Sequence, residues 1–348
     1  MKKILIFIIS SPFFVLAQIP PGYYNSAQGL VGNNLKVALY NIIKNHTVVS
    51  YGGLWTAFPK SDAKANGKVF DIYSYKPIGG QPYEYTFVTH QCGNYSMESD
   101  CYNREHSWPQ SWFNSTSGPD SDMFHIYPTD GYVNNQRGNY PFGNTSTVSW
   151  TSLNGSRVGA CANVGYSSTV FEPINEFKGD LARSYFYMTT RYYSEDAAWG
   201  SSPATNKATI LPWQLNVLLQ WHHQDPVSAK EIARNDSIYY LFQNNRNPFI
   251  DHPNWADSIW ATLSGIEELH NKPVYSIYPN PTLSGEMTIS GLENSNHVSV
   301  FNLLGVLVFE INSEKDSEHI DLSNQPSGVY FVRIKGVNSI STLKVLRD

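Results

Sequence analysis

The sequence has few charged residues, few cysteines and no long apolar stretch after its N-terminus. Asp, Glu, Lys and Arg make up 15% of the 348 residues, and the net charge is −5 with histidine neutral. This balance excludes a general basic surface for nucleic acid, so a polyanion would be bound through a local patch or a metal ion. The low charge content favours an exported protein. With 41% hydrophobic residues the chain can still bury a core, and its length suggests one large and one small domain.

Familiar motifs are also missing. The sequence contains no GxGxxG, no Walker loop, no GxSxG and no HExxH. No CxxC or Cys/His grouping suggests zinc. Any catalytic site must therefore be found from other residues.

The N-terminus has the parts of a secretory signal peptide. Two lysines precede an apolar run over residues 4–16, and Ala17 provides a small residue before a cleavage site at Gln18. The run is shorter than the ~20 residues that a membrane-spanning helix needs. We predict a signal peptide over residues 1–17 and a mature protein that is secreted or on the cell surface, without a membrane span and as a monomer.

The three cysteines leave at least one unpaired within the chain. Cys92 and Cys101 are close in sequence, so we expect a disulfide between them. Closing this short loop would stabilise the fold by ~2–3 kcal/mol. Three free thiols and a Cys101–Cys161 pair are the alternatives.

Short alternating strands separated by Pro- and Gly-containing turns occupy residues 273–348. A segment of this size predicts a small β-sandwich domain. Residues 278–281 (YPNP), 302–305 (NLLG) and 327–330 (SGVY) resemble the C-terminal sorting domain of type IX secretion cargo. The resemblance implies delivery by the type IX secretion machinery to the cell surface or the medium. A generic β adhesion module is the alternative.

Residues 18–272 form the other predicted domain, which mixes helices and strands. Helices are expected over residues 30–43, 177–193, 211–219 and 225–242, and strands over residues 69–73 and 83–88. The last of these helices is expected to be capped by Asp225, with Pro226 in its first turn. The elements do not alternate as in βαβ units, so the predicted fold class is α+β.

Residues 101–112 contain the first group of chemically useful side chains, with Glu105 and His106 adjacent. A carboxylate is a hard ligand for magnesium, and a neutral imidazole can take a proton from water. Adjacent side chains on an extended strand point to opposite faces, so a shared site would require the backbone to turn there.

Residues 122–143 contain the second group. Residues 128–130 (PTD) can cap a short helix that runs to about Arg137, which places Asn134 and Arg137 on one face. Asn134 offers an amide oxygen to a metal, and Arg137 offers a fork for phosphate. A Glu–His pair or a single Asn is usually a surface feature, but their combination indicates a one-metal hydrolase site.

These segments resemble the endonuclease I family, which comprises secreted or periplasmic nucleases with a ββα-metal (His-Me) finger. The resemblance rests on residues 103–109 (NREHSWP) and 122–143 and covers most of residues 25–265. Further matching blocks are residues 170–173, 178–183, 185–188, 225–228 and 247–253.

The resemblance implies a role for each residue of the site. His106 would be the general base, and Glu105 and Asn134 would be the protein ligands of one Mg²⁺, for which Mn²⁺ or Ca²⁺ can substitute. The implied reaction is hydrolysis of DNA, and often RNA, with little sequence preference. Water attacks phosphorus and the 3′ oxygen leaves, which gives 5′-phosphate ends.

One departure from the family concerns the phosphate. Some relatives carry an Arg in the loop after the catalytic His, but residues 107–121 contain no Arg or Lys. Its role is expected to pass to Arg137, Arg183 or Arg104, or to be absent. We expect a positive cleft around these three arginines on an otherwise acidic surface.

Two other functions remain as alternatives. The aromatic content of 14% would suit a secreted surface module that binds glycans or nucleic acid without catalysis. A phosphoesterase for another phosphodiester is the second alternative. We expect His125 to be a packed histidine rather than a metal ligand.

Overall fold

The computed structural model describes residues 19–77, 79–260, 275–292, 296–303, 305–336 and 340–348. The chain divides into two compact units, Met1–Ile266 and Glu267–Asp348. The predicted signal peptide and the predicted boundary between residues 272 and 273 lie outside the described residues. Within the described ranges, no helix combines the length and the apolar character needed to cross a bilayer.

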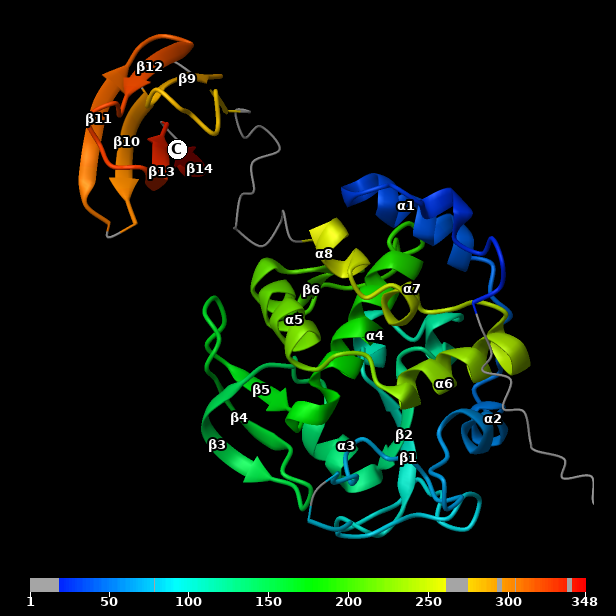
Figure 1. Cartoon of the computed structure of the whole chain (residues 1–348). Coiled ribbons are helices and arrows are strands. Elements are labelled where there is room, and N and C mark those ends of the chain that lie inside the picture. Colours follow the sequence, from blue (N-terminus) through cyan, green and yellow to red (C-terminus); the bar gives the residue numbers. More distant parts are fainter. Residues whose placement is uncertain (1–18, 78, 261–274, 293–295, 304, 337–339) are drawn as a thin grey trace, which may run out of the picture. The chain divides into compact units, whose positions relative to one another are not determined.

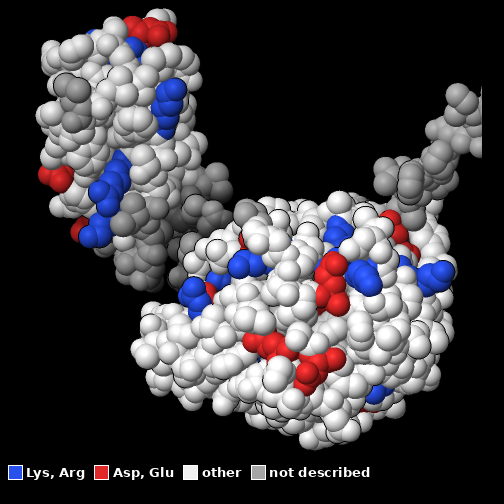
Figure 2. Space-filling view, turned by 90° about the horizontal axis from the view of Figure 1, so that it is seen from below, with Lys and Arg blue, Asp and Glu red and all other residues white. Residues whose placement is uncertain are grey.

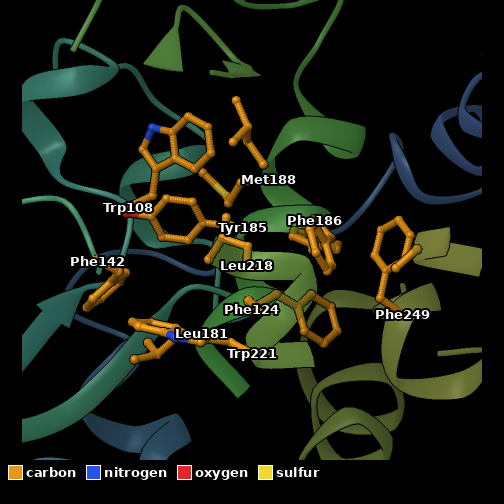
Figure 3. Close-up of a cluster of buried hydrophobic side chains, with 14 of the residues drawn as sticks. Trp108, Phe124, Phe142, Leu181, Tyr185, Phe186, Met188, Leu218, Trp221 and Phe249 are labelled. Atoms are coloured by element: carbon orange, nitrogen blue, oxygen red, sulfur yellow. The ribbon is translucent and has the colours of Figure 1, made fainter. Parts of the chain in front are cut away.

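Helix α4 (Lys178–Arg191) lies at the centre of the first unit, and all of its residues are buried. A helix that is buried on every side lies inside the core rather than on its surface. Helix α5 (Pro212–Gln224) packs against α4. The cluster in Figure 3 includes Trp108, Phe142, Tyr185, Leu218 and Trp221.

The remaining α-helices of the first unit cover this core. They are α1 (Gly32–Ile43), α2 (Leu54–Ser61), α3 (Gly131–Arg137), α6 (Ala229–Ile238), α7 (Pro248–Asp251) and α8 (Trp255–Trp260). The helices expected near α1, α4 and α5 are confirmed. The prediction of an Asp225 cap is wrong, because Ser228 caps α6 through a capping box with Glu231. The chain continues past α6 as a π-helix over Tyr239–Gln243.

The strands expected over residues 69–73 and 83–88 are absent from the structure. The carboxylate of Asp71 accepts a hydrogen bond from the backbone nitrogen of Tyr73 at 2.7 Å, which turns the chain instead of extending it. Val69 does pair with the backbone of Tyr85, but this contact does not extend into a ladder.

Two strands and a helix form one continuous segment, residues 102–137, which we call the ββα segment. Strand β1 (Tyr102–His106) pairs antiparallel with β2 (Ile126–Asp130), and α3 follows β2 directly. The Asp130 side chain caps α3 by accepting from the backbone nitrogen of Val133 at 2.9 Å. The helix that the sequence predicted to end near Arg137 is confirmed.

A three-stranded antiparallel sheet follows this segment in the chain. Its order is β3 (Thr145–Thr151), β4 (Arg157–Cys161) and β5 (Thr169–Glu172). A short hairpin, β6 (Thr205–Asn206) and β7 (Thr209–Ile210), lies further along the chain. Cys92 and Cys101 form a disulfide with 5.8 Å between their Cα atoms, and Cys161 is free.

The second unit is all β. One sheet has the order β11-β10-β13-β14 and the other β12-β9-β8, and both contribute to one apolar cluster. The strands are β8 (Ser276–Tyr278), β9 (Glu286–Ser290), β10 (Asn296–Asn302), β11 (Leu307–Ser313), β12 (Ser317–Asp321), β13 (Gly328–Lys335) and β14 (Ile340–Arg347). The predicted fold class, an α+β domain followed by an all-β domain, is confirmed.

Candidate active site

Strand β1 extends through His106, and the chain leaves the strand only at Ser107. The strand therefore does not make the turn between Glu105 and His106 that a site shared on one face would require. Because side chains alternate along a strand, Arg104 and His106 lie on one side of β1 and Glu105 on the other.

The Glu105 carboxylate is buried on the side that α3 covers. Its Oε1 accepts from the Tyr73 hydroxyl at 2.8 Å and lies 3.2 Å from Nη1 of Arg137. Burial raises the pKa of Glu105, while Arg137 and the Tyr73 hydrogen bond lower it. One arginine and one tyrosine thus fix the orientation of this carboxylate.

Asn134 reaches β1 from α3. Its Nδ2 donates to the Arg104 carbonyl at 3.2 Å, which turns the amide oxygen away from that carbonyl. Arg137 lies one helical turn later, on the same face of α3, and contacts Glu105. Through Asn134 and Arg137, helix α3 therefore contacts two neighbouring residues of β1, Arg104 and Glu105.

The His106 imidazole is 7% exposed, and its tautomer follows from one hydrogen bond. Nε2 lies 3.1 Å from the backbone oxygen of Asp120. A carbonyl can only accept, so Nε2 carries the proton and Nδ1 keeps its lone pair. Burial is the main cause that lowers the pKa of His106 to about 4, so the ring is neutral at pH 7. Such a ring can take a proton from water.

His125 is a packed histidine, and its ring lies beside that of His106. It is fully buried, with its ring 5.5 Å from that of His106. Its Nε2 lies 2.6 Å from the Pro119 carbonyl, next to the Asp120 carbonyl that His106 contacts. The two histidines together hold the loop at Pro119 and Asp120.

Arg137 does not present the phosphate-binding fork that we predicted. Its side chain is 1% exposed, and it donates from Nη1 to the His106 carbonyl at 2.8 Å and from Nη2 to the Ser107 carbonyl. With Glu105 as its ion-pair partner, the guanidinium is directed into the protein. Arg137 therefore holds the backbone and the carboxylate of the site in place.

The prediction that Arg183 binds phosphate is not supported either. It is fully buried on α4, where Nε donates to Glu231 at 2.5 Å and Nη2 to Asp180 at 3.3 Å. Since Arg137 and Arg183 are both internal, the predicted cleft around three arginines does not form. Figure 2 shows scattered basic groups and acidic side chains on a largely uncharged face of this unit.

Sequence reasoning missed two residues that shape the site. Tyr73 precedes Glu105 by 32 positions, and no local pattern links them. Asp120 acts on His106 through its backbone oxygen, which every residue type possesses. Only the folded structure could reveal either contact.

The donor set fits a hard cation held by few protein groups. Within the described ranges, no three or more His, Cys, Asp or Glu side chains gather as a metal site. One carboxylate and one amide oxygen, with water in the other positions, is a donor set that suits Mg²⁺, which keeps several waters when bound.

An α+β fold that carries a neutral histidine and an oriented carboxylate at adjacent positions of one strand is consistent with a hydrolase. Residues 31–254 match the Endonuclease I family, and residues 276–347 match the secretion system C-terminal sorting domain. The chain belongs to the endonuclease I family and is a nuclease, a phosphodiester hydrolase. This membership favours the enzyme over the surface-binding alternative.

Relatives from three bacteria support the same assignment. The chain is 37% identical over 253 residues to an extracellular ribonuclease of Bacillus amyloliquefaciens, covering 68% of this chain and 78% of that protein. It is 36% identical over 256 residues to an extracellular ribonuclease of Bacillus subtilis (strain 168), with the same coverage. Endonuclease-1 of Buchnera aphidicola is 24% identical over 132 residues, covering 38% of this chain and 46% of that protein. The sorting domain and the extracellular relatives identify a secreted or cell-surface protein.

Proposed function

We propose that the protein is a magnesium-dependent endonuclease that hydrolyses DNA and RNA to 5′-phosphate ends without sequence preference. The observation that carries this proposal is the His106 ring, whose Nε2–H is bound to Asp120 so that Nδ1 is left as the proton acceptor. The two relatives named ribonuclease support activity on RNA, and the one named endonuclease supports cleavage within the chain.

Glu105 and Asn134 would hold the magnesium ion, with water as the remaining ligands. When bound, the ion neutralises charge on the phosphate and on the departing 3′ oxygen. Tyr73 and Arg137 fix the Glu105 carboxylate, and the Arg104 carbonyl fixes the Asn134 amide. These contacts would orient both groups before the ion binds.

His106 would act as the general base. Nδ1 takes a proton from water while the water oxygen bonds to phosphorus and the bond from phosphorus to the 3′ oxygen breaks. The leaving oxygen gains a proton from solvent, and the imidazolium returns its proton to solvent. The Asp120 carbonyl stays bound to Nε2–H and stabilises the protonated ring, since it accepts in both states.

A nuclease assay of two histidine variants tests this function. Plasmid DNA, single-stranded DNA and RNA are incubated with wild type, His106→Ala and His223→Ala, each with magnesium or with EDTA. His223 lies on the same unit with its side chain 56% exposed, so its variant is a matched control. We expect His106→Ala to lose activity by about 10²–10⁴-fold, since it removes the general base.

EDTA should abolish the wild-type activity, and excess magnesium should restore it. His223→Ala should cleave like wild type. Normal cleavage by His106→Ala would refute the role of His106, and full activity in EDTA would refute the metal dependence.

A further inference from the structure

We propose that Arg104 binds the phosphodiester backbone of the nucleic acid beside His106. The inference rests on the proposed function and identifies the group that binds the substrate phosphate. Arg137 and Arg183 are internal, and residues 107–121 contain no Arg or Lys. A cation that faces the substrate near His106 would therefore have to come from another position in the sequence.

Position on β1 is the first argument. Arg104 and His106 are two residues apart on one strand, so their side chains lie on the same side. Tyr51 contacts both: its ring centroid lies 3.6 Å from Cζ of Arg104 and 5.9 Å from the His106 ring, with 27° between the ring planes. The guanidinium and the imidazole thus lie along one tyrosine ring.

Charge is the second argument. The buried arginines of this unit have carboxylate partners: Arg137 with Glu105, Arg183 with Glu231, Arg191 with Glu195, Arg234 with Asp62 and Arg246 with Asp251. Arg104 is half-buried, and in the described part of the chain it forms no ion pair. Asp120 is the acidic neighbour, and Gln110 binds one of its oxygens. Arg104 therefore keeps a positive charge available to an anion.

The third argument is the fixed position of the guanidinium. Nη1 donates to the Tyr51 carbonyl at 2.9 Å, and Cζ lies 4.5 Å from the Trp55 ring centroid. Nε is buried and has no hydrogen-bond partner among the described residues, so an anion would meet the other edge of the guanidinium. Stacking on aromatic rings orients an arginine without neutralising it, so less entropy is lost when it binds a phosphate.

The test measures binding of a labelled single-stranded DNA oligonucleotide at a series of salt concentrations. The His106→Ala protein is used, so that the probe stays intact, and Arg104→Met, Arg104→Lys or Arg157→Met is added to it. Arg157 is exposed on β4, outside the ββα segment, and serves as the matched control. Thermal unfolding of each protein checks that it is folded.

We expect Arg104→Met to weaken binding by about 10-fold at low salt, as loss of a charge-assisted contact does. Loss of one phosphate contact should also reduce the slope of log K against log salt by about 0.7 for single-stranded DNA. Arg104→Lys should keep the slope, because the charge remains. Arg157→Met should change neither quantity.

An unchanged slope and affinity in folded Arg104→Met would overturn the inference. If Arg104→Met does not fold, Arg104→Gln is measured instead, with the same two outcomes. The proposed function is judged separately by wild-type cleavage. Cleavage that depends on His106, together with an unchanged Arg104 slope, would reject only this inference.

Discussion

Arg137 shows what a buried charge contributes at the scale of single residues. Its residue type and its place one turn after Asn134 predicted contact with phosphate. Its burial could not be predicted from the sequence. In the folded protein the same fork binds the carbonyls of His106 and Ser107 and the Glu105 carboxylate. The placement of Glu105, His106 and Asn134 on one ββα segment could be predicted from the order of residues in the sequence, whereas the direction of each arginine depends on distant parts of the chain.

Replacement of Arg137 by methionine should destabilise the fold and weaken metal binding. It leaves the Glu105 carboxylate buried without its counter-charge, which costs about 3–5 kcal/mol of unfolding free energy. The freed carboxylate should also need more magnesium for half-maximal activity. Urea unfolding and a magnesium titration of cleavage measure the two effects.

Arg157→Met is the control for this change, because Arg157 is exposed. It should alter stability by no more than about 0.5 kcal/mol. A folded Arg137→Met protein with wild-type stability and magnesium dependence would show that the guanidinium does not position Glu105.

At the scale of helices and strands, local pattern predicts some elements and misses others. Apolar spacing was sufficient for α1, α4 and α5, and the Asp130 cap was sufficient for α3. The strand expected over residues 69–73 failed because one side chain, Asp71, binds the backbone and forces a turn. Patterns of hydrophobicity do not contain such a competing hydrogen bond.

The junction between β2 and α3 depends on the same carboxyl group. Asp71 Oδ2 accepts from the backbone nitrogen of Asp130 at 2.9 Å, so it fixes the residue that caps α3. Burial, with the nearby Asp130 charge, raises the pKa of Asp71 to about 7. The folded state therefore holds this proton at pH values where the unfolded chain has already released it.

Stability should consequently depend on pH through Asp71. Because the folded pKa is raised, this group makes the fold less stable as pH rises from about 4 to 7, by about 1 kcal/mol per pH unit. Asp71→Asn cannot ionise, but it loses one backbone bond. Its deficit relative to wild type should be largest near pH 4 and should shrink towards pH 8.

Urea unfolding of both proteins at pH 4, 5, 6, 7 and 8 measures this deficit. Asp321→Asn is the control, because Asp321 lies in the all-β unit and its pKa is lowered instead. A deficit for Asp71→Asn that is the same at every pH would contradict the assignment.

At the scale of the whole molecule, chemistry and delivery belong to separate units. The apolar cluster of the first unit contains residues of α4 and α5, while a different cluster lies between the two sheets of the second. Glu105, His106 and Asn134 all belong to the first unit. The family matches follow the same division, with the nuclease match ending at residue 254 and the sorting match beginning at residue 276.

A chain that ends at residue 272 should therefore keep the nuclease activity. Its core is complete without the second unit, so kcat/KM on single-stranded DNA should stay within about twofold of the full chain, a difference of about 0.4 kcal/mol in transition-state binding. Export should be lost, because the sorting domain is missing. Activity of the purified proteins and the amount of enzyme in the medium of the producing cells give the two measurements. The matched control is the full chain with His106→Ala, which should be exported normally but inactive. A large loss of activity in the truncated chain would show that the second unit contributes to the nuclease fold or to its substrate binding, and the proposed division at residues 272 and 273 would then be wrong.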